Sequence, residues 1–309
     1  MIVALAGGVG GAKLAEGLAA VLGSALTVIV NTADDFEHLG LPISPDLDTV
    51  MYTLAGIANP ETGWGLAGET WSFLDQVMRL GAPSWFRLGD RDLATHVLRA
   101  AALRAGQSLT AVTAELCRRL GIAARVLPMS DDPVRTIVHS AEGDLPFQEY
   151  FVARQCEVAV TGFAFAGIER ARPTDAVSGA LQARELEAIL VCPSNPFVSI
   201  DPILSLPNFR SLIADAGVPV IAVSPIIAGA AVKGPAAKMM RELGLDVSPL
   251  AVASHYRGLV THFVMDTADA ALASAVAALG MTVHLTDILM RDPADRRRLA
   301  EQCLVFARL

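Results

Sequence analysis

Short apolar runs, separated by glycine-rich or polar segments, recur along the whole chain. They lack the polar alternation of half-buried strands, which is typical of strands buried on both faces. The segments between them are long enough for helices, so the pattern predicts an α/β protein. A β-ribbon is also predicted, with Thr136–Ser140 and Pro146–Ala153 paired around Glu142-Gly143-Asp144. The predicted strands are Ile2–Ala6, Leu26–Val30, Ala124–Pro128, Val158–Ala166, Ile189–Cys192, Val218–Val223, Thr261–Val264 and Thr282–Leu285.

Helical composition fills most of the gaps between these strands. Thr70–Gly81, Leu93–Arg104 and Ser108–Leu120 follow one another with no apolar strand between them. We therefore predict one Rossmann-like α/β domain over residues 1–309, with a mostly parallel open sheet and a helical insertion over residues 70–125. Further helices are predicted at Ala12–Leu22, Thr49–Ile57, Pro173–Ala188, Asp269–Leu279 and Asp295–Ala307.

Composition and charge narrow the class of protein. The chain has 309 residues, of which 53% are hydrophobic and 18% charged, so it can bury a large aliphatic core. A net charge of -8 argues against a general nucleic-acid binder, because such proteins carry a basic face. The start MIVALAGG has no positively charged segment, and no apolar stretch reads as a membrane span, so we expect a cytoplasmic protein without a signal peptide. The four scattered cysteines are expected to be core thiols and not zinc ligands.

A glycine-rich segment, Gly7–Gly11, lies between the first predicted strand and the first predicted helix. Glycines let a backbone approach an anion, and a helix N-terminus supplies free N–H groups, so this arrangement is typical of phosphate binding. It matches no standard nucleotide fingerprint, because Lys13 replaces the third glycine of the dinucleotide motif and Asn31 replaces its acidic residue. We expect a phosphate or diphosphate site with Lys13 nearby; a glycine turn without a ligand is the alternative.

The stretch Asn31–Tyr52 follows the second predicted strand and holds five carboxylates, Asp34, Asp35, Glu37, Asp46 and Asp48. Open α/β sheets bind ligands at the carboxyl ends of their strands, and close carboxylates repel one another unless a cation lies between them. Mg²⁺ is the expected cation, since it takes one or two carboxylates together with substrate oxygens. A solvated acidic loop is the alternative, although Gly40, Pro42 and Pro45 make the stretch stiff and favour a site.

Two further regions carry candidate binding residues. Arg87 and Arg91 lie in a charged segment before a predicted helix. They would either form a second wall of the pocket, facing an anion or a planar ring, or belong to an ion-pair network at the helix start. Loops with hydroxyl and amide groups follow two later strands, with Ser194 and Asn195 in one and Ser224 in the other. Such side chains suit the base or ribose edges of a nucleotide.

Seven segments, in order from Gly7 to Met240, resemble the 2-phospho-L-lactate transferase family of deazaflavin coenzyme F-420 biosynthesis. They are GGVGGAKL, NTADD, ISPDLDTVMYTLAG, LGDRDLATH, LPMSDDPV, PSNPFVSIDPIL and VSPIIAGAAVKGPAAKMM. Several unusual segments in one order are far more specific than a lone glycine loop. The resemblance therefore extends over nearly the whole chain.

The resemblance implies a metal-dependent phosphoryl transfer. The acceptor would be the deazaflavin Fo, through its ribityl hydroxyl. The donor would be a guanosine diphosphate ester of a phosphorylated three-carbon acid, and GMP would leave. The acid would be 2-phospholactate or its phosphoenolpyruvate or phosphoglycerate equivalent, and the sequence does not distinguish these. Catalysis of this kind depends mostly on positioning and charge neutralisation.

The resemblance also assigns roles to residues. Asp48, in the PDLDT segment, is expected to meet the Fo hydroxyl as a base or positioning group. Asp34 and Asp46 are expected to hold Mg²⁺, and Asp35 beside them is a further catalytic or metal-binding candidate. Fo would contact Asp48, Arg87 and Arg91 beneath the insertion over residues 70–125. The diphosphate and guanosine would contact Gly8, Gly10, Gly11, Lys13, Ser194, Asn195 and Ser224.

Two other classes of protein stay open. An NAD(P)-dependent oxidoreductase would use the same sheet, but the missing third glycine and Asn31 count against it. A nucleotide-binding regulator of the related morphogenesis type would lack a deazaflavin pocket, whereas this chain keeps PDLDT and LGDRD. The expected partners are Fo and the guanosine ester, with no nucleic acid and no membrane, and Ala- and Leu-rich helices are compatible with a homodimer.

Overall fold

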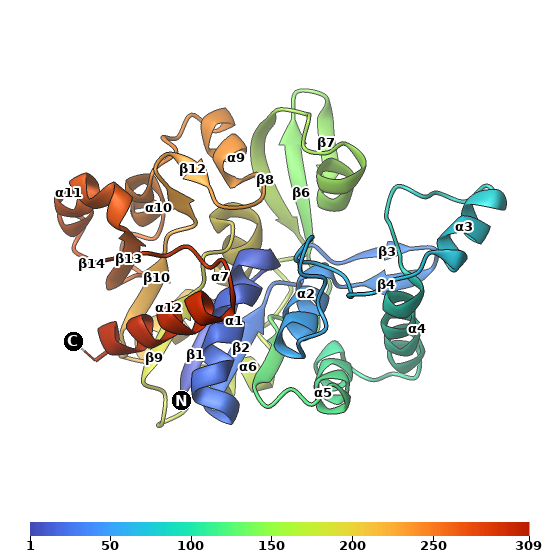
Figure 1. The fold of residues 1–309 in the computed structure, drawn as a ribbon, viewed down its shortest axis with the longest axis horizontal. Helices are drawn as coiled ribbons and strands as arrows, with labels where there is room; N and C mark the ends of the chain where they lie inside the picture. Colours follow the sequence, from blue (N-terminus) through green and yellow to red (C-terminus); the bar gives the residue numbers. More distant parts are fainter. Residues whose placement is uncertain (309) are drawn as a thin grey trace.

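Figure 1 shows the fold in a computed structural model, which describes residues 1–308. A central sheet of seven strands has the order β14-β13-β10-β9-β1-β2-β5. Every neighbouring pair is parallel, so the predicted Rossmann-like α/β fold is confirmed. The strands are β1 (Ile2–Ala6), β2 (Leu26–Val30), β5 (Arg125–Pro128), β9 (Ala188–Val191), β10 (Val220–Val223), β13 (His262–Asp266) and β14 (Thr282–Thr286).

The strand order locates a crevice for ligands. From β1 the chain adds β2 and β5 on one side, and then returns to the other side of β1 to add β9, β10, β13 and β14. In open sheets, ligands bind where this direction reverses, outside the carboxyl ends of the strands. The reversal lies between β1 and β9, so the segments that follow Ala6 and Val191 face the crevice.

Helices cover both faces of the sheet. Successive side chains of a strand point to opposite faces, so Ile2 and Ala4 belong to one core, whereas Val3 and Leu5 belong to the other. The first core includes α1 (Gly8–Leu22), α2 (Pro45–Leu54), α5 (Leu109–Arg119) and α12 (Pro293–Phe306). The second includes α6 (Asp175–Leu181), α7 (Asp201–Leu204), α8 (Phe209–Asp215), α9 (Ala236–Glu242), α10 (Pro249–His255) and α11 (Ala273–Ala277).

The C-terminal helix α12 lies across α1 (Figure 1). A Cβ atom at Gly17 would stand only 2.1 Å from the backbone oxygen of Arg296, so the two helices approach too closely for any side chain at this position. Arg296 also forms an ion pair with Glu16. The packing of α12 therefore holds α1, the helix that begins at the glycine-rich segment, in place.

Two predicted helices begin earlier than expected. α1 begins at Gly8 and α2 begins at Pro45, each about one turn before the predicted start. Proline at the first helical position and Asp in the first turn both favour a helix N-terminus, because the first N–H groups have no helical partner. Asp46 and Asp48 consequently lie in the first turn of a helix and not in a loop.

The short helices are η1 (Gly23–Ala25), η2 (Glu149–Ala153), η3 (Pro196–Ile200) and η4 (Thr267–Leu272).

Small antiparallel sheets stand beside the main one. β3 (Phe36–His38) pairs with β4 (Leu41–Ile43), and β11 (Ile226–Ile227) pairs with β12 (Ala230–Ala231). A third sheet contains β6 (Arg135–Ser140), β7 (Gly143–Pro146) and β8 (Val160–Ala166). The predicted β-ribbon is correct in its first strand and wrong in its second, because β7 ends at Pro146, which cannot donate to the ladder, and η2 follows.

The helices α3 (Ser72–Arg79), α4 (Asp90–Arg104) and α5 follow one another between α2 and β5. The first two lie at the right of Figure 1, beside β3 and β4. The boundaries 70–125 for an insertion stay a prediction.

Cys117, Cys192 and Cys303 are buried free thiols. No helix within residues 1–308 is long and apolar enough to cross a membrane.

Candidate functional site

A cavity of about 600 Å³ opens at the reversal point of the sheet. Its volume falls in the range of small-molecule sites. The segments after β1, β2, β9 and β10 supply its walls, together with α2, the region from Trp85 to His96, and η2. The predicted site residues that line it are Gly8, Gly10, Lys13, Asp34, Asp46, Asp48, Arg87, Ser194, Asn195 and Ser224.

The glycine-rich segment is packed against the loop after β9. A Cβ atom at Gly10 would lie 2.3 Å from the backbone oxygen of Pro193, so only glycine fits there. The N–H of Gly8 donates to Asp46 Oδ1 at 2.8 Å, which joins the start of α1 to the start of α2. Gly11 does not line the cavity; a Cβ there would stand 2.5 Å from the Oγ of Ser194. Gly11 thus allows close packing and is not placed to contact a diphosphate.

Lys13 lies one turn further along α1 and lines the cavity. Its Nζ donates to the backbone oxygen of Met290 at 3.1 Å. Burial lowers the pKa of Lys13, and the positive charge of Arg296 lowers it further. A bound anion would stabilise this partly dehydrated ammonium group, which supports the predicted role beside a phosphate.

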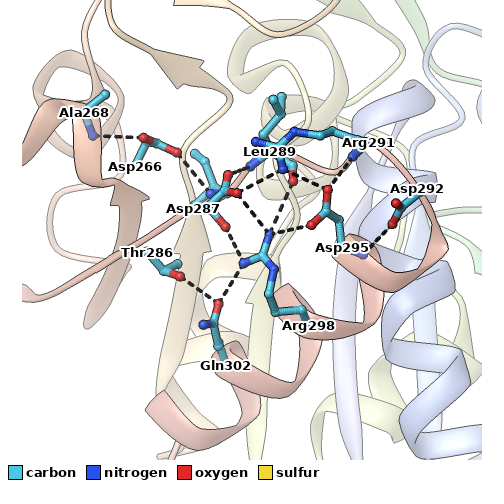
Figure 2. Close-up of polar contacts among 11 residues, drawn as sticks. Asp266, Ala268, Thr286, Asp287, Leu289, Arg291, Asp292, Asp295, Arg298 and Gln302 are labelled. Carbon is cyan, nitrogen blue, oxygen red and sulfur yellow. Dashed lines mark hydrogen bonds and ion pairs between the residues drawn. The ribbon is translucent and has the colours of Figure 1, made fainter.

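The segment that carries Met290 is held by a polar network (Figure 2). Asp266, at the end of β13, accepts from the N–H of Ile288 at 3.1 Å. Arg298 of α12 donates to the backbone oxygen of Asp287 at 2.7 Å. These contacts fix the segment between β14 and α12, so that Met290 forms part of the cavity floor.

Asp34 and Asp46 form a buried acidic pair. Burial raises the pKa of Asp34 well above its usual value, and the charge of Asp46 raises it further. Oδ1 of Asp34 is buried without a hydrogen-bond partner. Asp46 Oδ2 accepts from the amide of Asn31 at 3.0 Å, and burial also raises the pKa of Asp46. Two desolvated carboxylates therefore face the cavity without a positive partner from residues 1–308.

These residues fit the predicted Mg²⁺. A cation beside Asp34 and Asp46 would bind the orphan oxygen and remove the repulsion between the two carboxylates. Within the described chain no three His, Cys, Asp or Glu side chains converge on one point. The ion would thus depend on two carboxylates, water and phosphate oxygens, which is a set that Mg²⁺ accepts.

Asp48 has a different environment. Arg99 NH1 donates to Asp48 Oδ2 at 3.1 Å, and NH2 of the same guanidinium donates to Asp48 Oδ1. Only 5% of Asp48 and 1% of Arg99 are exposed. Both carboxylate oxygens are therefore held by one buried cation, on the wall of the cavity.

Asp35 lies behind the cavity wall and not on it. Its Oδ2 accepts from the Ser44 hydroxyl at 2.7 Å. Burial raises the pKa of Asp35 to about 8, although the Ser44 hydrogen bond and the charge of Arg99 oppose the shift. The side chain is placed to support its neighbours, and the structure does not bring it to a bound substrate.

An aromatic cluster forms another part of the cavity lining, through Trp85 and Phe86. The rings of Phe36 and Phe86 meet edge to face at 4.9 Å, and Trp85 packs on both with centroids 5.8 and 5.9 Å away. Arg87 lies 4.3 Å over the ring of Trp71 and also lines the cavity. Arg91 does not line it, because its guanidinium donates to the backbone oxygen of Ala67. Of the two predicted arginines, the structure brings only Arg87 to the cavity.

The predicted guanosine residues also line the cavity, but their polar atoms already have partners. Ser194 Oγ donates to the Gly7 backbone oxygen at 2.8 Å, and Asn195 Oδ1 accepts from Phe197 N–H at 3.0 Å. Ser224 Oγ donates to the backbone oxygen of Ile226 at 2.9 Å. These side chains shape the loops, so their backbone and remaining lone pairs are what a ligand would meet.

Sequence reasoning missed three residues of the site. Asn31 was considered only as a departure from the dinucleotide motif, yet it orients Asp46. His96 and Arg99 stand four and seven positions after Asp92, which places all three on one face of α4. The helical spacing of an acidic, an imidazole and a guanidinium side chain was the signal that could have revealed His96 and Arg99.

Comparisons with known proteins identify similar chains that are described as transferases. The profile of the family described as 2-phospho-L-lactate transferase CofD matches residues 2–293. A phosphoenolpyruvate transferase of Streptomyces coelicolor is 42% identical, over 99% of this chain and 98% of that protein. A 2-phospho-L-lactate transferase of Methanosarcina mazei is 40% identical, over 97% of this chain and 98% of that protein.

A solved structure is similar in fold. The crystal structure of a UPF0052-family protein from Bacillus halodurans covers 98% of this chain and 98% of its own, with a TM-score of 0.62. Its sequence is 14% identical, so this likeness concerns the fold alone.

Proposed function

Because this chain belongs to the 2-phospho-L-lactate transferase family, we propose that it transfers a phospho-three-carbon acid from a guanosine diphosphate ester to the ribityl hydroxyl of Fo. The match of the family profile over residues 2–293 is the observation that carries the proposal. The chain is thus a transferase of coenzyme F-420 biosynthesis. The acid is 2-phospholactate or its phosphoenolpyruvate or phosphoglycerate equivalent.

The proposed step exchanges one bond to phosphorus for another. The hydroxyl oxygen of Fo bonds to the phosphorus that carries the three-carbon acid. The bond from this phosphorus to the bridging oxygen breaks, GMP leaves with that oxygen, and the hydroxyl proton is released. A protein accelerates such a step mainly by aligning the two reactants and neutralising the phosphates.

The donor would occupy the end of the cavity beside α1 and β9. Lys13 supplies positive charge there, and the N-terminal end of α1 adds its dipole. Mg²⁺ bound by Asp34 and Asp46 would neutralise the phosphate oxygens. The loops that begin at Pro193 and Ser224 would enclose the guanosine.

The acceptor would occupy the side beside α2 and α4. Trp85 and Phe86 offer flat apolar surfaces for a planar ring system, and Arg87 offers a guanidinium at the same wall. Asp48 lines the same cavity. Its carboxylate would accept a hydrogen bond from the attacking hydroxyl and so orient it.

The test is turnover of Fo with a mixture of the three guanosine esters in the presence of Mg²⁺. Mass spectrometry of the Fo product identifies the acid, and GMP should appear in equal amount. An absence of product, together with no quenching of Fo fluorescence on titration with protein, would contradict the proposal. A nicotinamide cofactor that bound tightly in the same titration would favour an oxidoreductase instead.

A further inference from the structure

Arg99 is the bulkiest side chain that the fold buries completely. It comes from the middle of α4, and its guanidinium reaches across to the first turn of α2. There it donates through two nitrogens to the two oxygens of Asp48. A planar guanidinium held in this way fixes both the position and the rotation of a carboxylate, which a lysine cannot do.

Arg99 is itself held from behind by His96. NH1 of Arg99 lies 3.1 Å from Nδ1 of His96. Because a guanidinium can only donate, Nδ1 accepts in this contact, which leaves the ring proton on Nε2. Nε2 in turn lies 3.3 Å from Asp92 Oδ2, and Asp92 Oδ1 accepts from the Tyr52 hydroxyl at 2.7 Å.

These contacts orient each side chain in this series. Tyr52 and His96 face Asp92, while Arg99 faces His96 and Asp48. His96 lines the cavity, and its Nδ1 is engaged by Arg99, whereas Nε2 approaches Asp92 without forming a hydrogen bond. The chain of contacts ends on Asp48, which lines the cavity.

We propose that Arg99, backed by His96, is a positioning residue that holds the Asp48 carboxylate in the orientation required for transfer. This inference rests on the proposed function, because Asp48 is the group expected to meet the attacking hydroxyl. Arg99 touches neither substrate, so its removal affects the alignment of the hydroxyl in the bound complex. Binding of the donor, at the other end of the cavity, does not depend on it.

A purely structural role is the competing explanation, since a buried ion pair also joins α2 to α4. The experiment is steady-state kinetics of the full chain with Fo, the guanosine ester and Mg²⁺. Arg99→Lys keeps the positive charge but loses the two-nitrogen clamp. Arg104→Lys is the matched control, because Arg104 lies on the same helix and its side chain donates only to the Gly40 backbone oxygen, at 2.9 Å.

We expect Arg99→Lys to lower kcat about 100-fold, because a small misplacement of a reacting group has an effect of this order. The KM of the donor should stay within about threefold, and Arg104→Lys should match wild type. Wild-type kcat in Arg99→Lys, or a loss confined to the KM of the donor, would overturn the positioning role.

A double-substitution cycle separates positioning from folding. Arg99→Met/Asp48→Asn removes both members of the ion pair, so neither is left buried without the other. If Arg99 acts through Asp48, this variant has the kcat of Asp48→Asn alone, because residues that act as a unit are not additive. A further loss by the full factor of Arg99→Met would overturn the proposal. Wild-type protein that does not turn over Fo would overturn the proposed function, and this inference with it.

Discussion

Asp46 and Asp48 lie two residues apart in the first turn of α2, yet their environments are opposite. Asp48 is held by the buried guanidinium of Arg99. Asp46 is held by neutral groups, the N–H of Gly8 and the amide of Asn31, and it faces the unpaired Asp34. One carboxylate is therefore neutralised within the protein, whereas the other lacks a cation from the described residues.

The difference separates two halves of the cavity. In the half beside Asp48, the carboxylate is paired with Arg99 within the protein. The half beside Asp34 and Asp46 holds two carboxyl groups that repel each other when both are ionised, and a buried oxygen without a partner, which a bound cation would relieve. Both roles were interchangeable at the level of sequence, and the pairing with Arg99 supports assigning Asp48 to the acceptor and Asp46 to the metal.

The largest expected effect comes from Asp48→Asn, which removes the carboxylate charge that is paired with Arg99. We expect kcat to fall about 1,000-fold, because a group that orients or accepts the proton of a nucleophile contributes on this order. Turnover of Fo measures the loss, and circular dichroism checks that the variant is folded. Nearly normal turnover in a folded variant would remove Asp48 from the mechanism.

Removal of metal tests the half of the cavity beside Asp34 and Asp46. EDTA-treated protein should lose activity and regain it with added Mg²⁺. Asp46→Asn should raise the Mg²⁺ concentration for half-maximal activity by at least about 10-fold, since ligand-sphere changes have effects of this size. Arg104→Lys serves as the unaffected control. Full activity in EDTA would contradict a metal at this site.

Asp34→Asn should stabilise the metal-free protein, in contrast to Asp48→Asn. It removes a buried charge that has no cation, so the free energy of unfolding should rise by about 1–2 kcal/mol. Thermal unfolding in EDTA should then show Tm higher by about 2–8 °C. An unchanged or lower Tm would show that Asp34 is not strained in the metal-free state.

The pH dependence of stability should reveal the buried carboxyl groups whose pKa is raised in the folded protein. Burial raises the pKa of Asp46 to about 6 and of Asp35 to about 8, from an unfolded value of 3.8. A raised folded pKa contributes stability that is present below pH 3.8 and is lost as the pH rises through the folded pKa. The Tm in EDTA should therefore gain a falling contribution between about pH 4 and 8. Mg²⁺ should counter the part that is due to Asp46, and not the part that is due to Asp35, which lies away from the proposed metal. A Tm profile in which Mg²⁺ has the same effect at pH 5 and pH 8 would contradict this account.

The smallest effect is expected at the second acidic turn, Asp131-Asp132, which looks like Asp34-Asp35 in sequence. Both residues of this turn are exposed, and Asp131 accepts from the N–H and hydroxyl of Thr110 at 2.7 and 2.9 Å. Asp131→Asn should leave kcat unchanged and cost less than about 1 kcal/mol of unfolding free energy. A large loss of activity would mean that this turn reaches the site.

Much of the fold could be predicted from local pattern. Strands β1 and β2 were predicted residue for residue, because an uninterrupted apolar run has no other stable place than between two layers of helices. The helix starts were less accurate. The stretch before Thr49 contains acidic residues that looked like a loop, and the stretch before Ala12 contains glycines that are unfavourable in a helix interior. Both segments are helical because they occupy first turns, where these residues are tolerated.

The sequence by itself determined the α/β class, the glycine-rich and acidic segments at the ends of β1 and β2, and the resemblance that led to the family. These properties depend on residues close together in the chain, or on the order of short segments. Only the tertiary structure decided which carboxylate has a cation. Arg99 is 51 positions from Asp48, and no local pattern shows that α4 returns to the first turn of α2. The electrostatics of a buried site depend on such distant contacts, because burial amplifies each charge and only the fold sets its partner.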